Sequence, residues 1–189
     1  MHKLSRCNVW LMLSLAAIAI PLLFIALAAL LSGWFNIYNN ALSDLGHAVR
    51  SNVALIFNLG LSLGGLLLVI TSIGCIFRRY RVLSYVGVLV GYSLTLVAVF
   101  DEVYGRLHFI VSVAFFLSLA IMLITYMAVF KKVTPIPSLV VSVLAWYAHL
   151  TYRIPRGAAI PELISIFATM PFYIDVVLRS LKPCDEQQG

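Results

Sequence analysis

The sequence predicts an all-α polytopic membrane protein, a bundle of six transmembrane helices. Of the 189 residues, 62% are hydrophobic and only 11% are charged, and the mean hydropathy is +1.03. Soluble globular domains carry about 25% charged residues. Apolar stretches near the roughly 20 residues that a helix needs to cross a bilayer recur along the chain. Together they use nearly the whole length, which predicts a single integral membrane domain over residues 1–189.

Each span has recognisable boundary signals. The first is longer than the apolar core of a signal peptide, usually about 7–15 residues, so we expect it to stay as a helix. Basic residues end the second and fourth spans, at Arg78 and Lys131. Pro135 precedes a shorter fifth span, and Pro161 lies in the first turn of the sixth, where proline is tolerated. The spans are expected at residues 9–31, 52–77, 82–100, 107–130, 137–152 and 158–178.

The basic residues predict the orientation. If the N-terminus lies inside, nine of the 13 lysines and arginines fall in inner segments and four in outer ones. This excess predicts a protein of the cell membrane with both termini in the cytoplasm. The net charge of +6 then suits anionic lipid headgroups, and we expect no nucleic-acid partner. The inner set is Lys3, Arg6, Arg78, Arg79, Arg81, Lys131, Lys132, Arg179 and Lys182, and the outer set is Arg50, Arg106, Arg153 and Arg156.

Further patterns concern the helix bundle itself. The three cysteines, Cys7, Cys75 and Cys184, would all lie at the inner, reducing side, which predicts no structural disulfide. Glycine pairs spaced by four residues, from Gly60 and from Gly87, let helix backbones approach closely, and we expect them to pack within one chain. Asp175 and Arg179 share a helix face and predict an ion pair.

Ionisable residues gather where the spans end on the outer side. In the first loop, Leu42, Leu45 and Val49 are expected to form the apolar side of a short surface helix, and Ser43 is expected to cap it. Asp44 and His47 would share a face of that helix, so Asp44 could orient the imidazole, help to hold a metal or only hold the loop. Such groups near hydrocarbon are functional candidates by default.

The other outer turns add groups at similar depth. Asp101 and Glu102 are neighbours that would point in different directions, so at most one is expected to face a shared site. Glu162 lies in the first turn of the last helix, where the helix dipole favours a carboxylate; its alternative role is pairing with Arg156 or Arg153. Arg106, His108, His149 and Tyr152 complete this outer set.

Three imidazoles that converge can hold Zn²⁺ and activate a water molecule. The leading expectation is therefore an outward-facing polar pocket of His, Asp, Glu and Arg that binds a lipid or other amphiphile. If the chain is an enzyme, we expect a metal-assisted hydrolase acting on a lipid-like substrate. The metal ligands would be His47, His108 and His149; the catalytic groups Ser43, Asp44, Asp101 and Glu102; the substrate-binding groups Arg50, Arg106, Arg153, Tyr152 and Glu162. A haem between His108 and His149 is an alternative. So are a lipid-binding protein without catalysis, a transporter or channel, and a structural or partner-binding membrane protein.

The segment Asn40-Ala41-Leu42-Ser43-Asp44-Leu45-Gly46, followed by Phe57-Asn58-Leu59-Gly60 and by the stretch from Asp101 to His108, resembles a known family. This is the family of small six-helix prokaryotic membrane proteins labelled domain of unknown function nine-nine-eight, and similar loops occur in DRAM-like membrane proteins. The resemblance implies six helices and a polar outer loop. A more distant likeness, to the alkaline ceramidase and adiponectin receptor hydrolases, implies a Ser, an Asp and three His around zinc.

Overall fold

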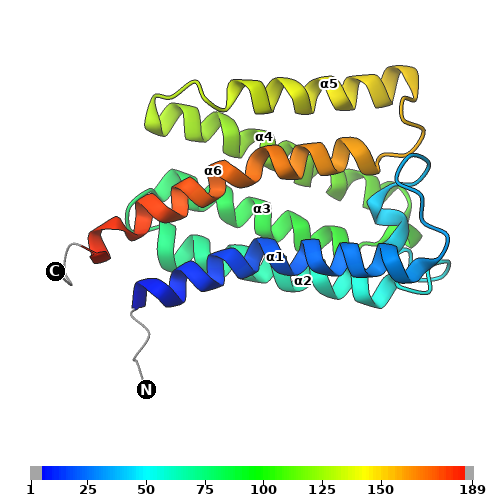
Figure 1. The fold of residues 1–189 in the computed structure, drawn as a ribbon, viewed down its shortest axis with the longest axis horizontal. Coiled ribbons are helices and arrows are strands. Elements are labelled where there is room, and N and C mark those ends of the chain that lie inside the picture. The colour runs from blue at the N-terminus through cyan, green and yellow to red at the C-terminus, as the bar shows by residue number, and fades with distance from the viewer. Residues whose placement is uncertain (1–5, 186–189) are drawn as a thin grey trace.

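The structure, a computed structural model, describes residues 6–185, with side chains described for residues 7–182. Within that range the chain forms six α-helices joined by short turns, as the sequence predicts (Figure 1). The 3₁₀ turns η1 and η3 lie in the first and third connections, and the π-helical turn η2 extends α2. The elements are α1 (Arg6–Ser32), η1 (Leu42–Gly46), α2 (Ala54–Thr71), η2 (Ser72–Ile76), α3 (Arg81–Val99), η3 (Glu102–Tyr104), α4 (Arg106–Phe130), α5 (Ile136–Tyr152) and α6 (Ala159–Asp185).

Five of these helices, α1, α2 with η2, α3, α4 and α6, are long and apolar enough to cross a membrane. The remaining helix, α5, has 17 residues and is too short to be counted among them, although the sequence predicts a span at residues 137–152. Helices α1 to α4 pack as successive neighbours, α6 packs against α1 and α4, and α5 lies at the edge of the bundle, mainly against α6 (Figure 1). The chain is therefore an apolar helical bundle of the kind that membrane proteins form.

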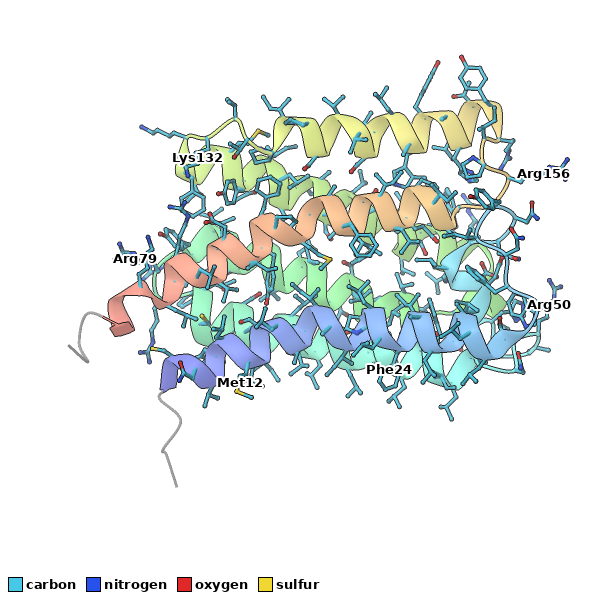
Figure 2. All side chains as sticks on the ribbon, in the orientation of Figure 1. Met12, Phe24, Arg50, Arg79, Lys132 and Arg156 are labelled. Atoms are coloured by element: carbon cyan, nitrogen blue, oxygen red, sulfur yellow. The ribbon has the colours of Figure 1, made fainter. Side chains whose placement is uncertain are left out.

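The two ends of the bundle differ in the chain segments and in the labelled basic residues that lie there. The beginning of α1 and the end of α6 lie at the same end, and the cap formed by the first loop lies at the other (Figure 1). Arg79 and Lys132 lie at the terminal end, whereas Arg50 and Arg156 lie at the capped end (Figure 2). The side chains of Lys3, Arg6 and Cys184, which entered the predictions of orientation and of cysteine pairing, lie outside the described set.

Glycines make the closest helix contacts within the chain, as predicted. A Cβ atom on Gly65 would lie 2.5 Å from the carbonyl oxygen of Gly91, and one on Gly91 would lie 2.6 Å from the oxygen of Gly65, so α2 and α3 meet backbone to backbone. A Cβ on Gly60 would lie 2.2 Å from the Cβ of Phe24 in α1. These distances are too short for any larger residue without a shift of the helices.

At the terminal end, the predicted ion pair is confirmed, because Arg179 Nε donates to Asp175 Oδ2 at 2.5 Å. The prediction of no structural disulfide is wrong: Cys7 is disulfide-bonded, while Cys75 is a free, buried thiol. That prediction rested on the redox state of a compartment. The expected position of the cysteines at one end of the bundle therefore did not decide their oxidation state.

Candidate functional site

The first loop folds into a cap over one end of the bundle, and Asp44 organises it. The backbone N–H of Ala41 and the side-chain amide of Asn40 both donate to Asp44 Oδ2 at 2.9 Å. This closes the 3₁₀ turn η1 and buries Leu42 and Leu45 beneath it. The expected apolar face is right for these two leucines and wrong for Val49, which is 79% exposed.

Ser43 does not cap this helix as expected, because η1 begins one residue earlier and Ala41 occupies the N-cap position. The Asp44 carboxylate performs the capping from inside the turn, and this leaves the Ser43 hydroxyl free for another partner. Asp44 and His47 are joined through their backbones, because the His47 N–H donates to the Asp44 carbonyl oxygen at 3.3 Å. Asp44 therefore organises the loop through Asn40 and Ala41.

The cap is attached to the start of α6. The backbone N–H of Leu42 donates to Glu162 Oε2 at 2.6 Å, a buried contact between residues 120 positions apart. Beside it, the N–H of Ala159 donates to the carbonyl oxygen of Asn40 at 3.0 Å. A Cβ on Gly157 would lie 2.2 Å from that same oxygen, so only glycine allows the two loops to approach this closely. Glu162, 7% exposed, thus joins the cap to the bundle.

A second contact joins the cap to the turn after α3. The Ser43 hydroxyl donates to Glu102 Oε1 at 2.8 Å. The pKa of Glu102 is raised to about 7, mainly by burial and also by the neighbouring Asp44 carboxyl, although the Ser43 hydrogen bond and the positive charge of Arg50 act to lower it. Glu102 is therefore partly protonated near neutral pH.

Of the two neighbouring acids, only Glu102 faces the cap. Asp101 is also buried, but its Oδ1 accepts the backbone N–H of Val103 at 2.8 Å and so caps its own 3₁₀ turn. The expectation that at most one of these residues faces a shared site agrees with this arrangement. A side chain hydrogen-bonded within two residues of its own backbone has a local structural role.

Three carboxyl groups from separate elements thus meet under the cap: Asp44 of η1, Glu102 of η3 and Glu162 of α6. Asp44 and Glu102 each lie close enough to interact electrostatically with Glu162, and Asp44 with Glu102. Among residues 7–182 the ion pair present is Arg179–Asp175, so Glu162 does not pair with an arginine and bonds instead to the backbone of Leu42. The centre of the candidate site is therefore acidic.

The three predicted histidines are each held by groups nearby in sequence. His47 Nδ1 accepts the N–H groups of Val49 and Arg50 at 3.3 Å. His108 Nδ1 lies 2.7 Å from the Phe100 carbonyl oxygen, and His149 Nδ1 lies 3.0 Å from that of Pro155. Within the described side chains, no three His, Cys, Asp or Glu residues form a group that could hold a metal ion. Zinc and haem binding therefore stay predictions.

The predicted substrate-binding residues other than Glu162 lie on the surface of this end. Arg50, Arg106, Arg153 and Tyr152 are all exposed. Arg50 and Arg156 project outward from the capped end (Figure 2). None of these residues lines the cavity that lies beneath the cap.

An elongated cavity of about 120 Å³ lies beneath the cap, between α1, α2, α3, α4 and α6. Leu42, Ser43 and Glu162 line its capped end, and Tyr173 lies further along α6. Because an α-helix rises about 1.5 Å per residue, the lining extends over roughly 16 Å of α6. Most of the wall is aliphatic or aromatic, including Ala17 and Leu119. A separate open groove of about 730 Å³, lined by Val141, Phe167 and Ala168 among others, lies between α5 and α6 and has no ionisable side chain in its lining.

Sequence reasoning missed this cavity, because residues from five helices line it and each resembles an ordinary core residue. The only signal was Glu162, an acidic residue inside an apolar helix. Comparison with known proteins adds a family: the model described as Protein of unknown function (DUF998) matches residues 15–178. No curated protein and no solved structure matches the chain.

Proposed function

The chain belongs to the DUF998 family, a family of proteins of unknown function, and from that premise we propose that it is a membrane protein that binds a lipid or other single-chain amphiphile in the cavity beneath its cap. The observation that carries the proposal is the composition of the cavity wall. It is mostly apolar along its length, and its capped end, which we call the mouth, carries the polar side chains of Ser43 and Glu162. This is the pattern of an amphiphile, with one apolar chain and one polar head.

The size and the mostly apolar lining of the cavity support this function. Apolar cavities of comparable volume, about 150 Å³, stay dry and take up small apolar ligands. A narrow, elongated space between helices favours an alkyl chain over a bulky ring system. The neighbouring membrane supplies such chains at high local concentration.

The test compares alanine-to-phenylalanine substitutions at three sites. Ala17→Phe fills the cavity, Ala168→Phe fills the separate groove between α5 and α6, and Ala26→Phe places the same side chain on the exposed face of α1. Native mass spectrometry of protein released from phosphatidylcholine nanodiscs would count retained dodecanol molecules. We expect about one per chain in wild type and in the last two variants, and a loss of about tenfold or more in Ala17→Phe. Equal retention in all three variants would refute binding in the cavity.

A second candidate function is hydrolysis at the mouth of the cavity. The observation that favours it is the Ser43 hydroxyl, which donates to Glu102 at 2.8 Å; the pKa of Glu102, about 7, suits a general base. If the site is hydrolytic, purified protein will cleave a dodecyl ester, and Ser43→Ala will abolish cleavage while dodecanol retention persists. Cleavage that survives in Ser43→Ala would exclude Ser43 as the nucleophile.

A further inference from the structure

The groups at the mouth of the cavity define which polar head an amphiphile can bring there. The head would meet Glu162, which lines the cavity and is 7% exposed, and Ser43, whose proton is already donated to Glu102. Asp44 and Glu102 add two more carboxyl groups within electrostatic range of Glu162. Oxygen atoms that accept hydrogen bonds therefore predominate at this end of the cavity.

We infer that the ligand of this site is an amphiphile whose head donates hydrogen bonds and is cationic or uncharged, an amine or an alcohol, and that a phosphate head is excluded. This inference rests on the proposed function, since it concerns the head of the molecule whose chain fills the cavity. It also departs from the expectation that arginines bind the head. Arg50, Arg106 and Arg153 are exposed and lie outside the cavity lining.

Hydrogen-bonding capacity supports the inference. An ionised carboxylate has about four acceptor positions and no donor. Glu162 uses Oε2 for the Leu42 N–H, so its carboxyl group retains acceptor capacity toward a ligand in the cavity. An ammonium or hydroxyl head can donate to these oxygens. A phosphate head would bring a further negative charge against Asp44, Glu102 and Glu162 in a poorly hydrated space, where repulsion is stronger than in water.

Arg50 is the cation that acts on this mouth, through its effect on Glu102. It is exposed and projects from the capped end (Figure 2), so solvent screens its charge. One screened arginine does not compensate three carboxyl groups, of which Glu162 is buried. The mouth thus keeps an acidic character within a protein whose formal net charge is +6.

Non-specific attraction to a basic protein would favour an anionic probe, whereas the acidic mouth should disfavour one. The two effects therefore predict opposite preferences among the probes. The probes are dodecylamine, dodecanol and dodecyl phosphate, which share one chain and differ in the head. Near pH 8 the amine is still protonated, because alkylammonium groups have a pKa of about 10. The protein is held in phosphatidylcholine nanodiscs and retention is counted by native mass spectrometry, with Ala17→Phe defining the signal that does not come from the cavity.

We expect cavity-specific retention of dodecylamine and dodecanol to exceed that of dodecyl phosphate by about tenfold or more. Glu162→Gln keeps an acceptor for the Leu42 N–H while removing the charge, so it should reduce the difference in retention between dodecylamine and dodecyl phosphate. Equal or stronger retention of dodecyl phosphate, sensitive to Ala17→Phe, would overturn the inference and leave the proposed function standing. If no probe responds to Ala17→Phe, both the inference and the proposed function fail.

Discussion

The Glu162 carboxylate accepts the backbone N–H of Leu42 at 2.6 Å, and this buried contact fastens the first loop of the chain to its last helix. An unpaired buried N–H is costly, and a carboxylate is a strong acceptor for it. The same carboxyl group lines the cavity under the cap. Glu162 therefore both holds the cap and contributes to the cavity lining, and substitutions can separate these two roles.

Replacing Glu162 by alanine should loosen the cap. Glu162→Ala leaves the Leu42 N–H without its partner and should lower the free energy of unfolding by about 1–3 kcal/mol. Hydrogen exchange measured by mass spectrometry should become faster in residues 39–46 and stay unchanged in α3. Glu162→Gln retains an acceptor and is the matched control. Unchanged exchange in residues 39–46 of Glu162→Ala would show that the contact does not hold the cap.

The stability of the cap should depend on pH through Glu102. The pKa of this residue in the folded protein, about 7, lies above its ordinary value of 4.5, so folding favours the protonated form. The resulting stabilisation is complete below pH 4.5 and is lost as the pH rises through 7. The Tm should therefore fall between about pH 5 and pH 8 by more in wild type than in Glu102→Gln, which cannot titrate.

The charged neighbours of Glu102 must stay the same when the pH dependence of Tm is compared between wild type and Glu102→Gln. Asp44 and Arg50 change its pKa in opposite directions, so the comparison with Glu102→Gln must be made in an unchanged background. Exposed residues titrate equally in both proteins and cancel in the difference. Parallel curves of Tm against pH for the two proteins would contradict a raised pKa at this position.

Replacing Gly65 by a larger residue should disrupt the packing of α2 against α3. In Gly65→Ala the new methyl group would lie 2.5 Å from the carbonyl oxygen of Gly91, a backbone atom that cannot rotate away. Overpacking of this kind costs about 1–3 kcal/mol. Thermal unfolding in detergent should show a clear fall in Tm. The control is Leu66→Ala on the exposed face of α2, which should change Tm less.

The orientation of the site is a prediction that reporter fusions can test. The sequence assigns nine of the 13 basic residues to inner segments, so reporters at either terminus should report the cytoplasm, and a reporter inserted after Val49 should report the outside. Cys7 is disulfide-bonded, and disulfides are rare in the cytoplasm, where the predicted orientation places this residue. The reporter fusions therefore decide between two conflicting indications. Termini found outside would place the cap and its cavity mouth on the cytoplasmic side.

The sequence predicted the helices well because membrane crossing imposes a length and a composition on each one. It also predicted the Asp175–Arg179 pair, which depends only on spacing along one helix. The shape of the cap was predicted less well. The expected helix face of Leu42, Leu45 and Val49 assumed α-helical spacing, whereas η1 is a short 3₁₀ turn and leaves Val49 exposed.

The contacts of the site were beyond sequence reasoning. Helix ends give the depth of a residue in the membrane, but they do not give its position around the bundle. His47, His108 and His149 have similar expected depths and separate local partners, whereas Ser43 meets Glu102 across 59 positions of sequence. Which residues of similar depth become neighbours depends on helix packing, set partly by Gly65, and on contacts between loops, such as the one that Gly157 allows.

The cavity wall takes Ala17 from the first helix and Glu162 from the last. A chain emerging from the ribosome therefore cannot assemble this pocket until α6 has been inserted. Until then, the backbone N–H of Leu42 lacks its acceptor on α6. Truncation before α6 would therefore leave the cap without this attachment and the cavity without one of its walls.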